Sequence, residues 1–227
     1  MRTLISLILF GFLLGYELRA EPSTIQKTSA ITEQTGHYAI NPQFDAVKEF
    51  SEGLAAVRIG DKWGFIDKQG TIVINPQFLQ AFSFQEGLAI VRIRDKWEFI
   101  DKQGKWGFID KQGTMVINPQ FSHTIPFREG LAAVRIGDKW GFIDKQGTMV
   151  IKNPQFSRAY SFREGLAGVR IGDDKTGKWG FIDKRGTIVI KPQFDSATWI
   201  FEGGFQEGLA MVRIGDNKTG KWGFISR

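Results

Sequence analysis

Residues 52–70 read EGLAAVRIGDKWGFIDKQG, and this stretch decides the fold because the chain repeats it. The phrase returns with small changes four more times, and a Glu-Gly pair opens each of the five copies, at 52, 86, 129, 164 and 207. Self-similarity at a period of about 20–50 residues is the signature of arrays in which each unit buries its apolar face against its neighbours. The sequence therefore predicts a tandem-repeat architecture.

The spacing of the tryptophans shows where the copies differ. Trp63 and Trp97 are 34 residues apart, as are Trp106 and Trp140. The later intervals are 39 and 43 residues. A turn gains four residues in each, Lys152 adds one residue to the first, and a longer loop at 195–204 adds five to the second. In residues 97–113, WEFIDKQG is followed at once by KWGFIDKQG, so a nine-residue unit has been duplicated there. We expect one of these two units, the one that begins at Trp97, to be irregular or looped out.

Within a copy, the side chains alternate with a period of two rather than 3.6, as they do in residues 54–59. The β-branched run at 71–74 suits a pleated surface. Gly60-Asp61 fits a two-residue hairpin loop, and Asp67 begins a turn in which its side chain can accept a hydrogen bond from the backbone two residues on. Asn75-Pro76 is expected to end the third strand, because proline has no donor for the ladder.

These features predict an all-β fold of tandem repeats, each a three-stranded antiparallel meander, stacked in an open curved array. The alternative is a closed propeller-like ring. The open array is favoured because a unit of 34 residues is short for a four-stranded propeller blade, which takes about 40–45 residues.

The recurring Lys-Trp-Gly-Phe-Ile-Asp-Lys-x-Gly, followed by Ile-x-Pro-Gln-Phe and Phe-x-Glu-Gly-Leu-Ala, resembles the WG-repeat (KWG-repeat) proteins of bacteria. The resemblance covers residues 38–227 and includes a truncated first copy at 38–44. It implies a β-rich repeat module, often exported or attached to other domains, with no shared catalytic residues. Glu98 departs from the pattern, because it stands where the motif has glycine.

The N-terminus predicts export. Arg2 precedes an apolar stretch from Leu4 to Leu14, and Ala20 fits the last residue before a cleavage site, which is the layout of a secretory signal peptide. The apolar stretch is far shorter than the ~20 residues that span a bilayer, so no stable transmembrane span is expected after cleavage. The alternatives are an uncleaved anchor and an apolar N-terminal strand. We therefore predict a signal peptide at 1–20, a flexible leader at 21–37 and the repeat domain at 38–227, in a periplasmic or extracellular protein.

Motifs for catalysis and cofactors are weak. Residues 172–178 and 215–221 match GxxxxGK, but a tryptophan follows each instead of Ser or Thr, and a strand instead of a helix. The chain has two histidines and no cysteine, so a His/Cys zinc cage is not available. Carboxylates that recur at one turn fit turn formers better than calcium ligands. We expect no enzyme activity, no metal and no cofactor.

A nucleic-acid partner is not expected either. The formal net charge is +6, but acidic and basic residues are interspersed. An arginine recurs beside aromatic-rich strands, at 58, 92, 135, 170 and 213, and we expect it to pair with neighbouring acids or to lay its stem over apolar surface. The tryptophans, which precede a glycine at a fixed position, are expected to pack in the core.

The segments after each Pro-Gln-Phe vary between copies, and variable segments of repeat proteins map to loops that are often the binding side. The sequence predicts a non-catalytic protein-binding or scaffolding module at the cell envelope or outside the cell, with an unidentified protein or envelope polymer as its partner. The alternatives are a surface carbohydrate-binding protein that uses exposed aromatics and, further behind, a hydrolase assembled from the loops. The candidate partner-binding residues are Phe82, His123, Tyr160, Trp199, Ile200 and Phe201.

Overall fold

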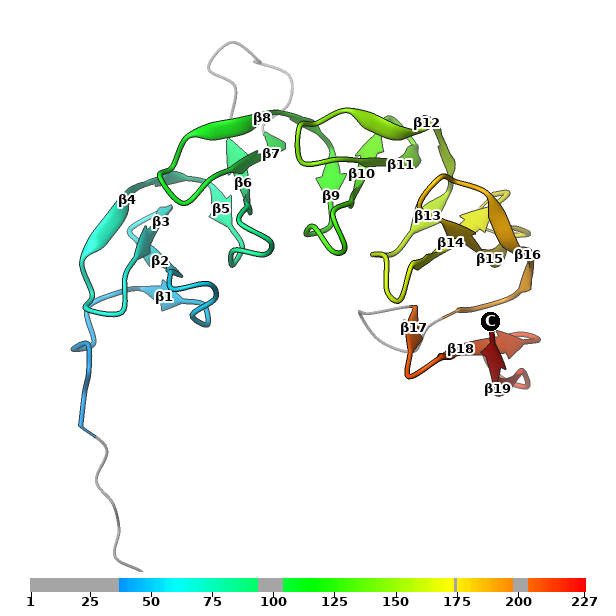
Figure 1. Ribbon diagram of the computed structural model, residues 1–227. Helices are drawn as coiled ribbons and strands as arrows, with labels where there is room; N and C mark the ends of the chain where they lie inside the picture. The colour runs from blue at the N-terminus through cyan, green and yellow to red at the C-terminus, as the bar shows by residue number, and fades with distance from the viewer. Residues whose placement is uncertain (1–36, 94–103, 174, 198–203) are drawn as a thin grey trace, which may run out of the picture. The chain divides into compact units, whose positions relative to one another are not determined.

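The computed structural model describes residues 37–93, 104–173, 175–197 and 204–227. Residues Tyr38–Arg227 form one compact unit. All secondary structure in the described residues is strand, bend or turn, and every strand pairing is antiparallel (Figure 1). That part of the chain holds no helix with the length and apolar character needed to cross a bilayer.

The first sheet has the order β1-β2-β3-β4. Its strands are β1 (Ala46–Val47), β2 (Ala55–Ile59), β3 (Lys62–Ile66) and β4 (Ile72–Phe78). The Gly60-Asp61 pair joins β2 to β3, as the hairpin pattern predicts.

The later sheets repeat this plan. The second consists of β5 (Gln80–Ala81), β6 (Ala89–Ile93), β7 (Lys105–Ile109) and β8 (Met115–Phe121). The third consists of β9 (His123–Thr124), β10 (Ala132–Ile136), β11 (Lys139–Ile143) and β12 (Met149–Phe156). The fourth consists of β13 (Arg158–Ala159), β14 (Leu166–Ile171), β15 (Lys178–Asp183) and β16 (Ile188–Phe194). The last has three strands, β17 (Phe205–Gln206), β18 (Leu209–Ile214) and β19 (Lys221–Ser226).

The all-β fold of tandem antiparallel meanders is therefore confirmed. No sheet of the described residues joins strands from the first and last repeats, as expected of an open array. Each sheet also contains a two-residue strand that the sequence pattern did not predict. In the first four sheets this strand lies in the segment after Pro-Gln-Phe or its equivalent, which was expected to be loop.

The expectation that Asn75-Pro76 ends the third strand is wrong. Strand β4 continues through Pro76 to Phe78, and its pairing with β3 shifts register between Trp63 and Phe65. Proline is tolerated because β4 is an edge strand with a bulge. The bulge also explains the recurring Trp-Gly pair, since a Cβ added at Gly64 would lie 2.4 Å from the carbonyl oxygen of Ile74.

Phenylalanine pairs join each sheet to the next. Phe65 of β3 packs against Phe84 of the following repeat with ring centroids 4.9 Å apart, and both side chains are fully buried. The three later joints use Phe108–Phe127, Phe142–Phe162 and Phe181–Phe205. Because each core is shared between neighbouring sheets, stability depends on the joints as much as on the sheets.

A ladder of glutamates also spans the joints. Glu52, Glu86, Glu129, Glu164 and Glu207 all have φ between 50° and 54°, a left-handed conformation that non-glycine residues seldom adopt. At the first four positions, the carboxylate accepts a hydrogen bond from the backbone N–H of the next repeat's equivalent glycine. The same carboxylates pair with Lys111, Lys145, Lys184 and Arg227.

The duplicated unit has one copy in the sheet. Arg92 of β6 lies opposite Trp106 of β7, the register that Arg58 and Trp63 have in the first sheet. The Trp106 copy thus occupies the regular strand, whereas Trp97 and Glu98 lie outside the described residues.

Candidate functional site

One face of each sheet carries an arginine directly opposite a tryptophan on the neighbouring strand. The pairs are Arg58–Trp63, Arg92–Trp106, Arg135–Trp140, Arg170–Trp179 and Arg213–Trp222. Directly opposed residues of an antiparallel pair share a face and pack together. In the second and last sheets, the guanidinium carbon lies 5.4 Å from the tryptophan ring centroid. We call these residues the Arg–Trp face.

The short strand adds a residue that differs from sheet to sheet. Ala46, Gln80, His123 and Arg158 each lie opposite the arginine of their own sheet. The constant Arg–Trp pair is therefore bordered by a small, an amide, an imidazole or a guanidinium side chain, and this variation is where copies can differ in what they recognise.

Aromatic side chains two residues further along cover some of the tryptophans. Phe82 lies with its ring 5.5 Å from that of Trp106, and Tyr160 stacks on Trp179 at 4.6 Å with an angle of 13° between the rings. Burial raises the pKa of the Tyr160 phenol, against the opposing effect of two nearby arginines. Among the described tryptophans, Trp179 is buried and the other four are partly buried, in line with a packing role.

Lys48 occupies the equivalent position in the first sheet. Its Nζ lies 3.7 Å from the ring centroid of Phe82 and 5.4 Å from that of Trp63, which is cation–π geometry. Burial lowers the pKa of this ammonium group. Lys48 therefore reaches from one repeat to the next along the Arg–Trp face.

Several of the arginines have a buried Nε without an acceptor. Within the described residues, this holds for Arg58, Arg92, Arg135 and Arg213. Arg170 differs, because its Nε donates to the carbonyl of Gly177 at 3.0 Å, and Gly177 belongs to the four-residue extension of that turn. The four-residue extension thus supplies a hydrogen-bond acceptor for the Nε of one of the five arginines on the Arg–Trp face.

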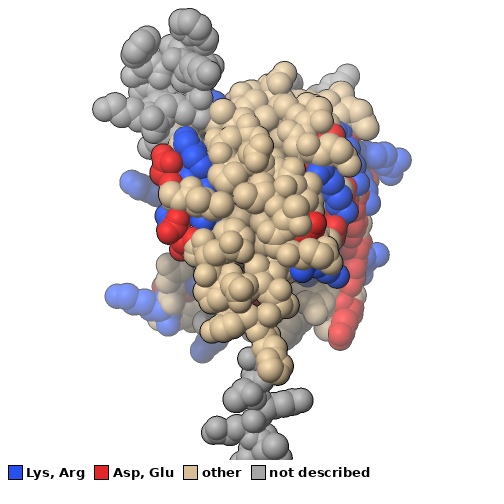
Figure 2. All heavy atoms as spheres, turned by 90° about the vertical axis from the view of Figure 1, so that its left-hand side faces the viewer, with Lys and Arg blue, Asp and Glu red and all other residues tan. Residues whose placement is uncertain are grey.

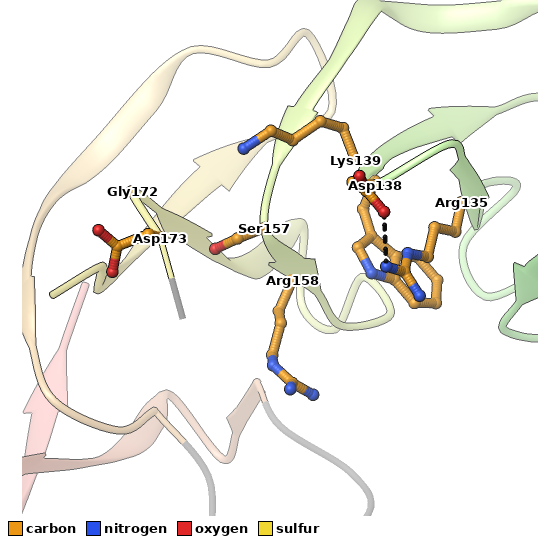
Figure 3. Close-up of a pocket in the computed structure, with 8 residues that line it drawn as sticks. Arg135, Asp138, Lys139, Ser157, Arg158, Gly172 and Asp173 are labelled. Atoms are coloured by element: carbon orange, nitrogen blue, oxygen red, sulfur yellow. Dashed lines mark hydrogen bonds and ion pairs between the residues drawn. The ribbon is translucent and has the colours of Figure 1, made fainter. Parts of the chain in front are cut away.

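A hollow of about 310 Å³ opens on this face between the third and fourth sheets. The β10–β11 hairpin contributes four of its lining residues and the fourth sheet contributes the other four (Figure 3). They are Arg135, Asp138, Lys139, Trp140, Ser157, Arg158, Gly172 and Asp173. We call this the inter-repeat hollow.

The two carboxylates of the inter-repeat hollow are already engaged. Asp138 pairs with Arg135 at 3.4 Å. Asp173 accepts hydrogen bonds from the backbone N–H of Thr176 and of Lys175, and these bonds lower the pKa of its carboxyl group. The GxxxxGK motif at 172–178 is therefore an aspartate-capped turn. Lys139 and Arg158 add two cationic groups to the lining of the hollow.

On the face that Figure 2 shows, uncharged side chains form a central band flanked by both signs of charge. The net charge of +6 is thus not gathered into one basic patch on this face. No group of three or more His, Cys, Asp or Glu side chains in the described ranges is arranged to hold a metal ion.

The structure places three of the six predicted partner-binding residues on the Arg–Trp face. Phe82 and Tyr160 follow short strands, and His123 lies within one, with its ring 6.4 Å from that of Trp140. They belong to three different sheets. Trp199, Ile200 and Phe201 lie outside the described residues.

The inter-repeat hollow was missed from the sequence. Ser157 and Arg158 lie in a segment that varies between the repeats, so comparison of the copies could have marked them as candidates. The Gly-Asp-Lys hairpin at 137–139 gives no such signal, because its sequence is that of an ordinary turn. That it faces the variable segment of the next repeat follows only from how the sheets pack.

Comparison with known families identifies the repeats. The pattern of the WG containing repeat matches residues 33–63, 63–97, 106–140, 140–175 and 179–222. The chain belongs to this family. The WG repeats thus cover most of the β domain, and each matched segment begins or ends at one of the recurring tryptophans.

No curated protein matches the WG-repeat chain. Two solved structures of AztD from Citrobacter koseri are similar, one of them the apo form, each with 13% sequence identity. Their TM-scores are 0.37 and 0.36, and the matches cover 74% of this chain. The chain covers 65% and 66% of those chains, which is less than two thirds of their length.

Proposed function

We propose that this WG-repeat chain is an exported, non-catalytic module that binds another protein through its Arg–Trp face. The observation that carries the proposal is the inter-repeat hollow, which the cationic residues Lys139 and Arg158 line together with the partly buried Trp140. Hollows lined by an aromatic ring and cationic groups suit acidic side chains, which gain a charge-assisted hydrogen bond where water is partly excluded. The partner is therefore expected to present Asp or Glu residues.

The chemistry of the hollow supports binding rather than catalysis. A general acid or base needs a side chain whose pKa lies near the pH at which the enzyme works. Asp138 and Asp173 are instead engaged with an arginine and with turn N–H groups. His123 lies opposite Arg135 in the sheet, so a cation, and not a carboxylate, is its cross-strand partner.

The carbohydrate alternative receives less support. Sugar platforms are exposed aromatic faces, whereas the tryptophans here lie beside arginines, and Phe82 and Tyr160 cover two of them. The expectation of export comes from the signal-like N-terminus. Cell fractionation with N-terminal sequencing of the mature protein tests it: a cytoplasmic protein that retains Met1 would contradict export.

Site-specific photo-crosslinking in the native compartment tests the recognition surface. A photoreactive residue at Asp138, which projects at the hollow, is expected to capture a protein partner. One at Lys191 on the outer strand β16 serves as the matched control. The double variant Lys139→Ala/Arg158→Ala should lower capture at least tenfold with the same melting temperature, and added salt should weaken capture by the parent. Equal capture from both positions, or capture that the double variant leaves unchanged, would overturn the proposal.

A further inference from the structure

The last sheet has an open edge where the earlier sheets have a fourth strand. In three of the earlier sheets, the backbone of that strand passes so close to the Trp-Gly glycine that a Cβ would meet a carbonyl oxygen at 2.4–2.6 Å, as it would at Gly64, Gly107 and Gly180. At Gly223 of β19, a Cβ would meet nothing within 4 Å. No described strand pairs with the outer edge of β19, which thus lies open beside a glycine that permits close backbone approach.

The apolar side of the last sheet is also uncovered. Phe224 is 67% exposed, whereas its counterparts Phe65, Phe108, Phe142 and Phe181 are fully buried under a phenylalanine of the next repeat. Leu209 is exposed too, although its counterparts Leu54 and Leu88 are buried. The β17–β19 sheet therefore has the surface of an internal joint, on which no other described residues of the chain pack as a repeat.

The first repeat carries the complementary parts. Residues 40–44 read INPQF, the same five residues as Ile74–Phe78 of β4. Ile40 lies 3.1 Å from a Cβ built at Gly70, just as Ile74 lies 3.2 Å from one at Gly113. The segment thus already lies where the fourth strand of a preceding repeat would be, yet no described strand pairs with it.

Phe50, the phenylalanine that would pack against a preceding repeat, is likewise exposed. Phe50 is 43% exposed, although its counterparts Phe84, Phe127, Phe162 and Phe205 are at most 1% exposed. An aromatic side chain left in water at this position is costly unless a partner covers it.

The ladder of glutamates also has groups without a described partner at both ends. At the first internal joint, Glu52 accepts from the N–H of Gly87 and pairs with Lys111. Glu207 is the last glutamate, and no described residue pairs with it. At the other end of the array, no described residue pairs with Lys68, which is the counterpart of Lys111.

We propose that this chain assembles head to tail with a second copy of itself. Residues 40–44 of one copy form the fourth strand on β19 of the other, with Phe44 opposite Trp222 and Ile40 opposite Phe224. This pairing repeats the register of Phe78 with Trp63 and of Ile74 with Phe65. Phe50 then packs on Phe224, and Glu207 meets the Gly53 N–H and Lys68.

The contact is heterologous, so it generates either a ring or a filament, depending on whether the rotation closes. Addition of a strand to an open edge supplies main-chain hydrogen bonds, and the phenylalanine pair supplies specificity. A second copy is the occupant that the structure favours, because every element of the internal joint recurs in the chain's own first repeat. This surface is distinct from the Arg–Trp face and does not depend on the proposed function.

Light scattering after size exclusion tests the assembly. The mature protein is expected to rise in mass as its concentration increases to about 0.1 mM, a range that detects micromolar contacts. Phe224→Asp should shift it to the monomer with an unchanged circular dichroism spectrum, because Phe224 is already exposed. The control Val189→Asp replaces another exposed apolar residue, on β16, and should leave the mass unchanged. A parent that stays monomeric, or a Phe224→Asp protein that assembles like the parent, overturns the proposal.

Cross-linking distinguishes contact between copies from closure within one chain. The protein has no cysteine, so Phe50→Cys and Phe224→Cys can each be made in a differently tagged copy and mixed with a short bismaleimide. A covalent dimer carrying both tags, absent from either variant alone, is the expected result. A chain with both substitutions that cross-links only internally would show intramolecular closure and overturn the proposal.

Discussion

The carboxylate of Glu52 accepts a hydrogen bond of 3.0 Å from the backbone N–H of Gly87, 35 residues later in the chain. Glu52 reaches it from a φ of 52°, a conformation that costs an L-residue roughly 1–2 kcal/mol. A glycine would adopt this φ without strain, so the recurring glutamate is explained by what its side chain reaches. The strain in one repeat is offset by a bond to the next.

Glu129→Ala tests this ladder. The substitution keeps the strained φ but removes the bond to Gly165 at 3.0 Å and the ion pair with Lys184 at 3.1 Å. We expect the free energy of unfolding to fall by about 1–2 kcal/mol, mostly from the hydrogen bond, since exposed ion pairs contribute little. Urea unfolding followed by tryptophan fluorescence measures the change.

Glu207→Ala is the matched control. Glu207 has the same φ, 54°, but no described residue pairs with it. At concentrations where the protein is monomeric, its replacement should change the free energy of unfolding by less than about 0.5 kcal/mol. An equal loss at the two positions would mean that the glutamates act within their own loops.

The tryptophans should differ in their contribution to stability according to burial. Trp179 is 5% exposed and stacks on Tyr160, so Trp179→Ala is expected to cost ~3–5 kcal/mol. Trp222 lies in the last sheet and is partly exposed, so Trp222→Ala should cost less than half as much. Chemical denaturation of both variants checks the ranking. Equal losses would contradict it, and lost binding without lost stability in Trp179→Ala would favour a ligand-platform role.

Local chemistry was predictable from the sequence. Asp67 was expected to bond its own backbone, and its Oδ1 accepts from the N–H of Gln69 at 2.9 Å and of Thr71 at 2.8 Å. The same turn recurs at Asp110, Asp144 and Asp183. Such patterns depend on residues a few positions apart, so they remain visible in a single sequence.

The joints between repeats were not predictable in the same way. Neither the glutamate ladder nor the bulge that carries β4 past Pro76 follows from local propensity, because each depends on how one backbone approaches another. Gly64 is the one local sign of the bulge, since a glycine in the middle of a strand often marks a close backbone approach. The sequence alone does not say which backbone approaches it. The inter-repeat hollow is likewise formed by two sheets, and no single segment encodes it.

The duplicated unit gives a prediction about loop length. Strands β6 and β7 pair in the same register as β2 and β3, although many more residues separate them. Deletion of residues 97–105 would leave a two-residue hairpin loop, with Lys96 in the place of Lys105. Because a shorter loop costs less entropy to close, the melting temperature should stay the same or rise. A fall of several degrees would show that the extra unit contributes to the folded structure.

Asp195 should make the last two repeats sensitive to acid. Its carboxylate accepts hydrogen bonds from Lys178 of β15 and from the backbone N–H of Gly215, and these, the lysine first, hold its pKa below the ordinary value of 3.8. A carboxyl whose pKa is depressed by folding stabilises the protein above its unfolded pKa, and this contribution is lost as the pH falls through the folded pKa. Asp195→Asn should therefore destabilise the protein near neutral pH, with a difference from the parent that shrinks below about pH 4. Urea unfolding of both proteins from pH 7 to pH 2 measures this convergence, and a difference that does not depend on pH would assign the loss to packing instead of charge.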